Sequence, residues 1–131
     1  MREEATIRAA IDAWNDGGVD AFLECVTDDV EWHAPPNFPE GELWRGRDVV
    51  AAALREQFGT VFSSGRVEVR NVTAGPSGWL LEAQHSVEGQ ASGMDLAWRV
   101  FLVLELEDEL IRRMWAFLER EPAARQAGLD G

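Results

Sequence analysis

The sequence predicts an α+β domain in which helices cover one face of a strongly curved, largely antiparallel sheet. Apolar residues recur at helical spacing in the first part of the chain and at strand spacing in the second, and glycine- or proline-containing turns separate the segments. Helices followed by a run of strands are typical of this class. A strongly bent sheet closed by helices leaves a cone-shaped cavity in which a ligand can bind.

The predicted helices occupy most of the first 59 residues. Between Ile7 and Trp14, apolar side chains fall at i, i+3, i+4 and i+7, which is the spacing of a helix with one buried face. We expect Gly17-Gly18 to end this helix. Apolar residues from Val19 to Val26 predict a second, shorter helix, and a third is expected from Asp48 to Gly59.

The predicted strands begin at Val30–Ala34, which Pro35-Pro36 ends, and residues 36–45 read as a loop. Further strands are expected at 67–72, 79–87, 96–106 and 110–118, with a short closing helix at 122–128. In the strand 96–106 the even positions are all apolar, and Phe101 and Val103 lie on the opposite face. This pattern predicts cover on both sides of that strand.

Composition argues against several partners and mechanisms. The net charge of −12 disfavours nucleic acid and anionic membrane surfaces as partners, because both are bound through basic patches. No stretch approaches the roughly 20 consecutive apolar residues of a membrane span. The chain contains neither Lys nor Tyr, so a lysine Schiff base and a tyrosine acid are both excluded.

The length and the cysteine count indicate one ordinary domain, residues 1–131, in a reducing compartment. Cys25 is the single cysteine, and its apolar surroundings predict a buried small side chain rather than a nucleophile. The charged N-terminus enters a helical pattern directly, so we expect no signal peptide and a cytoplasmic protein.

Four segments carry a resemblance to a known family. They are residues 28–35 (DDVEWHAP), residues 44–48 (WRGRD), the closing strand 112–117 (RRMWAF) and residues 124–129 (ARQAGL). Their order and spacing resemble the nuclear transport factor 2-like superfamily, in particular its SnoaL-like (polyketide cyclase-like) branch, over nearly the whole chain. The resemblance implies a cone-like α+β barrel that is usually a homodimer joined through the sheet. Phe101 and Val103 would suit such an interface.

The superfamily includes isomerases, cyclases, dehydratases, epoxide hydrolases and binding domains, so the fold does not decide the function. Isomerases of this fold place a general-base Asp just before the proline that ends the first strand, where this chain has Ala34, and a Tyr on the first helix, where it has Ala10. Epoxide hydrolases use an Arg-x-Asp on a strand, and Arg99-Val100-Phe101 lacks the Asp. Cyclases pair an acid with a histidine of the sheet, and His85 is the counterpart of that histidine, with no acid assigned.

His85 is the main candidate for chemistry because it is the one polar member of an otherwise apolar strand face. A neutral histidine in the predicted cavity could act as a base near pH 7 or orient a phenol or ketone. The alternative is a core histidine bonded to a buried group. His33 has the opposite parity from Trp32 and should point away from the cavity. Two histidines 52 positions apart without a cysteine partner form a poor metal signature, so we expect no metal and no cofactor.

Five tryptophans are candidate ligand contacts, with the last two as first choices: Trp14, Trp32, Trp44, Trp98 and Trp115. Each alone is more often a core residue, but several indoles around one cavity would form a flat apolar pocket. The acidic pair Asp28-Asp29 reads as an Asx-type turn, and Arg45 and Arg47 as structural ion pairs.

The sequence therefore predicts a protein that binds a small hydrophobic, cyclic molecule. Any catalysis would be cofactor-independent proton transfer, as in isomerisation or aldol cyclisation, with His85 as base or polariser. The alternative is a non-catalytic binding or dimerisation module.

Overall fold

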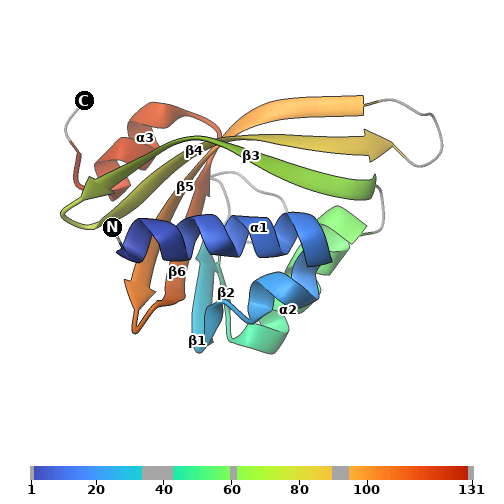
Figure 1. The fold of residues 1–131 in the computed structure, drawn as a ribbon, viewed down its shortest axis with the longest axis horizontal. Coiled ribbons are helices and arrows are strands. Elements are labelled where there is room, and N and C mark those ends of the chain that lie inside the picture. The colour runs from blue at the N-terminus through green and yellow to red at the C-terminus, as the bar shows by residue number, and fades with distance from the viewer. Residues whose placement is uncertain (1, 34–42, 60–61, 90–94, 130–131) are drawn as a thin grey trace.

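The computed structural model describes residues 2–33, 43–59, 62–89 and 95–129 (Figure 1). Ala34 and most of the predicted loop after it lie outside the described residues. The elements are α1 (Arg2–Leu23), β1 (Val26–His33), β2 (Leu43–Arg45), α2 (Arg47–Gly59), β3 (Phe62–Gly75), β4 (Gly78–Gly89), β5 (Asp95–Glu107), β6 (Leu110–Phe117) and α3 (Arg120–Gln126). Within these ranges, every helix is too short or too polar to span a membrane.

The six strands form one mixed sheet in the order β2-β1-β6-β5-β4-β3. β1 runs parallel to β6, and all other neighbouring strands are antiparallel. The sheet does not close into a complete barrel, because β2 and β3 remain its two edges. In Figure 1 the sheet curves behind α1 and α2. The predicted α+β class with a curved sheet is confirmed.

Two hydrophobic clusters cover the two faces of the sheet. The inner face packs against α1 and α2 in a cluster that includes Ile7, Ile11 and Leu54. The outer face packs against α3, where Ala123, Ala124 and Ala127 lie on Leu80, Phe101 and Val103. The predicted cover on both sides of β5 is thus confirmed, but Phe101 and Val103 are buried by the chain's own last helix. They are therefore not free to form the dimer interface expected for them.

The two helices predicted before β1 are one element with a break. Gly18 has φ 73° and ψ −153°, a conformation that is open essentially only to glycine, and the helix resumes after it as far as Leu23. The predicted second helix extended too far, because Val26 belongs to β1. Val26 is fully buried and pairs with Ile111 of β6, and this tertiary pairing overrides its helical spacing.

The first two strands also differ from prediction. Asp28 and Asp29 lie within β1, where the pairing with β6 shifts register between Val26 and Glu31, so the predicted Asx-type turn is wrong. The Thr27 hydroxyl donates to Asp29 Oδ1 at 2.8 Å within this irregular stretch. The short strand β2 falls inside the segment predicted as a loop.

Candidate functional site

His85 lies on the inner face of the sheet, near the middle of the long strand β4. It pairs directly with Val67 of β3 and with Trp98 of β5. Only 6% of the residue is exposed, and among the residues whose side chains are described it is the one buried polar side chain. The predicted inward orientation is confirmed, and it follows from the alternation of side chains along β4.

Two indoles contact the imidazole. The Trp98 ring lies 4.8 Å from the His85 ring between centroids, tilted by 32°. The Trp14 ring, from α1, approaches edge-on at 6.4 Å and 89°, and it makes a similar edge contact with Phe22 at 5.8 Å. We call Trp14, Phe22, His85 and Trp98 the inner ring cluster. It joins residues that are up to 84 positions apart in sequence (98 − 14).

Burial determines the charge of His85. Removal of the ring from water lowers its pKa from 6.5 to about 4, because the imidazolium loses its hydration. The ring is therefore neutral at pH 7, with one nitrogen able to accept a hydrogen bond or a proton and the other able to donate one.

A second indole pair lies on the inner face at the other end of the sheet. Trp32 of β1 stands directly opposite Trp44 of β2 and pairs on its other side with Met114 of β6. Trp32 is only 7% exposed, and Trp44 packs against the same hydrophobic cluster. Within the described ranges, no acceptor lies within hydrogen-bond distance of Trp32 Nε1.

Trp115 lies on the opposite face from these side chains. Its neighbours along β6, Met114 and Ala116, are buried in the inner cluster, so the alternation of the strand turns Trp115 outward. There it stacks on His33, with 4.9 Å between ring centroids and 19° between the planes. Trp115 therefore does not join His85 as predicted, whereas the outward orientation predicted for His33 is confirmed.

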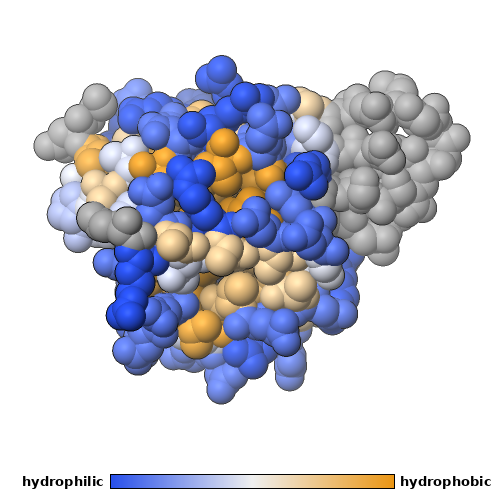
Figure 2. Space-filling view, viewed as in Figure 1, coloured by the Kyte–Doolittle hydropathy of each residue, from blue (hydrophilic) through white to orange (hydrophobic). Residues whose placement is uncertain are grey.

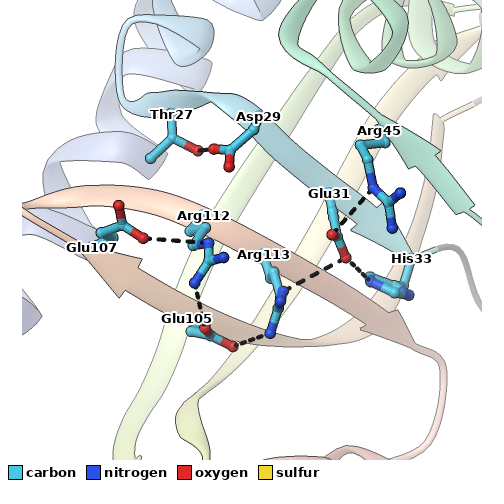
Figure 3. Close-up of polar contacts among 9 residues, drawn as sticks. All are labelled: Thr27, Asp29, Glu31, His33, Arg45, Glu105, Glu107, Arg112 and Arg113. Atoms are coloured by element: carbon cyan, nitrogen blue, oxygen red, sulfur yellow. Dashed lines mark hydrogen bonds and ion pairs between the residues drawn. The ribbon is translucent and has the colours of Figure 1, made fainter.

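The outer face carries a network of charged groups from four strands, β1, β2, β5 and β6 (Figure 3). Glu31 lies at its centre, 3.1 Å from His33 Nε2, 3.3 Å from Arg45 Nε and 3.6 Å from Arg113 Nε. Arg113 also reaches Glu105 at 3.4 Å. Arg112 continues the network to Glu105 at 3.8 Å and to Glu107 at 3.3 Å.

This environment shifts the titration of Glu31. Burial acts to raise the pKa of its carboxyl group, but the hydrogen bond from His33 and the guanidinium groups of Arg45 and Arg113 outweigh it and lower the pKa. Sequence reasoning missed this network, apart from the ion pair of Arg45. The signal that could have revealed it is the odd position of Glu31, Glu105 and Arg113 in their strands. This shared position indicates contact only when the register that pairs Arg113 with both acids is known.

The remaining candidates have structural roles. Arg47 reaches Asp28 at 3.0 Å and donates to the Val26 carbonyl at 2.7 Å, so the predicted ion pairing of Arg45 and Arg47 is confirmed. Cys25 is half-buried, and burial, with a further contribution from Glu24, raises the pKa of its thiol. A raised pKa keeps the thiol protonated at pH 7, which disfavours a role as nucleophile.

A groove lies between α1 and the edge strand β3. Its volume is about 390 Å³, and its lining residues are Arg8, Ile11, Asp12, Asn15, Arg66, Val67, Glu68 and Val69. Figure 2 shows hydrophobic surface between α1 and the long strands above it, bordered by hydrophilic side chains. The groove includes neither His85 nor any of the five candidate tryptophans. Among the described residues, no group of three or more His, Cys, Asp or Glu side chains is arranged to hold a metal ion.

Solved structures with the same fold cover almost the whole chain. A protein of unknown function described as NTF2-like, from Burkholderia pseudomallei K96243, aligns with a TM-score of 0.76 at 15% identity, over 97% of this chain and 98% of its own. TerC co-crystallised with polyporic acid gives a TM-score of 0.76 at 16% identity, over 97% and 98% of the two chains. A putative SnoaL-like polyketide cyclase from Jannaschia sp. CCS1 gives 0.72 at 20% identity, over 96% and 90%.

At these identities the similarity establishes the fold, and the function is left open. No curated protein matches the sequence significantly. The family model of the SnoaL-like domain matches residues 7–114, which is most of the 131-residue chain. The chain therefore belongs to the SnoaL-like domain family.

Proposed function

We propose that the inner face binds a small hydrophobic, cyclic molecule beside His85. The observation that supports this most strongly is the buried, neutral imidazole between Trp14 and Trp98. Indoles offer broad apolar surfaces on which a flat ring can stack, and a neutral imidazole offers one polar contact. The combination fits a ring compound that carries a hydroxyl or carbonyl group.

The contacts differ in what they contribute. A ring nitrogen of His85 accepts a hydrogen bond from a phenol or enol, or donates one to a ketone. The Trp32 N–H is a second donor on the inner face, available for a ligand oxygen. TerC was crystallised with polyporic acid, and the Jannaschia protein is described as a putative SnoaL-like polyketide cyclase, so ring compounds of polyketide type are the first ligands to test.

The same geometry supports proton transfer without a cofactor. A neutral ring nitrogen of His85 takes a proton from the carbon next to a ligand carbonyl, which leaves an enolate, and the imidazolium returns the proton to another carbon. His85 is neutral again at the end, and the product is an isomer of the ligand. The low pKa of His85 favours rapid return of the proton, because the imidazolium is a strong acid in this environment.

The second candidate function is a non-catalytic dimerisation or binding module. The charged network of the outer face favours it, and so does Trp115. The Trp115 ring packs against the cluster that α3 covers and remains partly exposed. We propose that a second copy of the chain packs here. Leu43, which pairs with His33 at this edge of the sheet and is 44% exposed, adds apolar surface.

The chain's two histidines provide a matched pair of variants to test the ligand site. Thermal shift and tryptophan fluorescence would be measured against fused-ring polyketides, steroids, terpenoid epoxides and fatty acids. At 100 times its dissociation constant, a ligand stabilises the fold by about 2.7 kcal/mol. We expect this shift in the wild type and in His33→Gln, and a much smaller one in His85→Gln. Equal shifts in all three proteins would place the ligand elsewhere.

A further inference from the structure

Asn15 joins α1 to the edge strand β3 through two hydrogen bonds. Its Nδ2 donates to the carbonyl of Val67 at 2.8 Å, and the N–H of Val67 donates to its Oδ1 at 2.7 Å. Among the described strands β3 has no neighbour on this side, so the amide takes the place that the backbone of another strand would occupy. We call this pair of hydrogen bonds the Asn15 clamp.

The clamp lies level with His85. Val67 is the residue directly opposite His85 in the pairing of β3 with β4. Trp14, the neighbour of Asn15 on α1, makes the edge contact with the His85 ring. Contacts therefore link Asn15 to Val67, Val67 to His85, and His85 back to Trp14 beside Asn15. Because of this linkage, α1 can move away from His85 at this level only if the hydrogen bonds of the clamp break.

The helix itself holds this position weakly. Asp16 separates Asn15 from the pair Gly17-Gly18, and the backbone at Gly18 leaves the helical conformation. A helix that is interrupted two or three residues further on loses hydrogen bonds at that end and frays more easily. The position of Trp14 therefore depends on contacts to the sheet rather than on a continuous helix.

The clamp also separates His85 from solvent. Asn15, Ile11 and Val67 line the groove between α1 and β3, whose charged side chains are Arg8, Asp12, Arg66 and Glu68. Ile11 and Val67 are both buried, and on their inner side lies the core that contains the ring cluster. If α1 moved away from β3 at this level, water from the groove would reach the imidazole.

We propose that Asn15 is a positioning residue of the ligand site, which holds Trp14 against His85 and excludes water from the His85 imidazole. This inference rests on the proposed function of the inner ring cluster. The competing explanation is that Asn15 only satisfies the backbone of an edge strand and stabilises the fold. The two explanations differ in what happens to His85 when the clamp is removed.

The test is the pKa of the His85 imidazole, measured by NMR on the ligand-free protein. In Asn15→Ala we expect the pKa to rise from about 4 by about 1 unit or more toward 6.5, because water reaches the ring. Arg8, Asp12, Arg66 and Glu68 are unchanged in this variant. Ile111→Val is the control, because it removes one methyl from the core beneath β1 and β6, away from the clamp, and should lower stability without moving this pKa.

An unchanged His85 pKa in Asn15→Ala, or an equal rise in Ile111→Val, would overturn the proposal. If Asn15→Ala does not fold, Asn15→Ser carries the same test with the same expected direction. Ligand affinity is then measured separately. If Asn15→Ala raises the His85 pKa but no ring compound binds the wild type, the role of the clamp is supported and the proposed function is rejected. If a ring compound binds tightly but the His85 pKa does not change in Asn15→Ala, the proposed function is supported and the role of the clamp is rejected.

Discussion

Burial between two indoles should make His85 a source of pH-dependent stability. In the unfolded chain its imidazole has the ordinary pKa of 6.5, and in the folded protein the pKa is about 4. Between these values the unfolded chain binds more protons, so the free energy of unfolding falls as the pH is lowered from about 6.5 to about 4. Above pH 6.5 both states are neutral, and the effect is absent.

His85→Gln removes this titration and leaves the other acidic and basic groups in place. Between pH 7 and pH 4.5 we expect the wild type to lose about 2 kcal/mol more than the variant, a magnitude that follows from 1.36 kcal/mol per pKa unit. Urea unfolding at the two pH values measures the difference, and the repulsion within a chain of net charge −12 cancels in the comparison. Parallel losses in the two proteins would show that His85 is not shielded from water.

Single residues differ in how far their place could be predicted. The orientation of His85 follows from simple alternation along β4. Trp115 could not be placed in this way, because Ile111 and Met114, three positions apart, both face inward and β6 shifts register against β5 between them. The role of Asn15 was beyond prediction, since its partner is the backbone of a residue 52 positions away.

At the scale of elements, the hairpin of β5 and β6 has a strained turn. Asp108 and Glu109 have φ values of 52° and 69°, and side chains other than Gly, Asn and Asp rarely adopt such values. Two-residue turns with both φ angles positive favour glycine at the second position. Glu109 therefore costs stability where it stands, and its ion pair with Arg2 at 2.8 Å is too exposed to offset much of that cost.

We expect Glu109→Gly to raise the free energy of unfolding by about 0.5–1 kcal/mol. The variant loses the left-handed strain, and this gain exceeds the opposing cost of the greater backbone freedom that glycine has in the unfolded state. Chemical denaturation of the two proteins measures the change. Glu109→Ala is the control, since it removes the same ion pair without relieving the backbone. If the alanine variant is stabilised as much as the glycine variant, strain at this turn is not the cause.

The ends of several elements are set by pairing between strands that lie far apart in the sequence. The stretch 19–26 has helical spacing throughout, yet Val26 pairs with Ile111 on β6. The segment predicted as a loop contains β2, whose Trp44 pairs with Trp32. Local pattern indicated the type and order of most elements, and tertiary pairing decided where α1 ends and where β1 and β2 begin.

At the scale of the whole molecule, the two faces of the sheet have different chemistry. The inner face is apolar with a neutral histidine, and the outer face carries a network of ion pairs beside Trp115. The α+β class was predictable because periodicity and turns are local properties. The parallel pairing of β1 with β6 and the position of α3 were not, because both join segments far apart in the chain.

The proposed homodimer should depend on salt. Each copy carries a net charge of −12, so two copies repel at low ionic strength, and salt screens that repulsion. We expect association to strengthen between about 0.01 M and about 0.15 M salt, where the Debye length falls from roughly 30 Å to roughly 8 Å. Sedimentation velocity measures this, with Trp115→Arg as the variant that weakens the outer face. A monomer at every salt concentration would reject the dimer.

Ligand binding at the inner ring cluster is tested by an NMR titration of the two imidazoles with a ring compound that raises the melting temperature. His85 reports on the inner face and His33 on the outer face, so one sample contains both the probe and its control. We predict that the ring signals of His85 shift saturably as the ligand is added, while those of His33 stay in place. Unmoved His85 signals at saturating ligand would show that the ligand does not bind at the inner ring cluster.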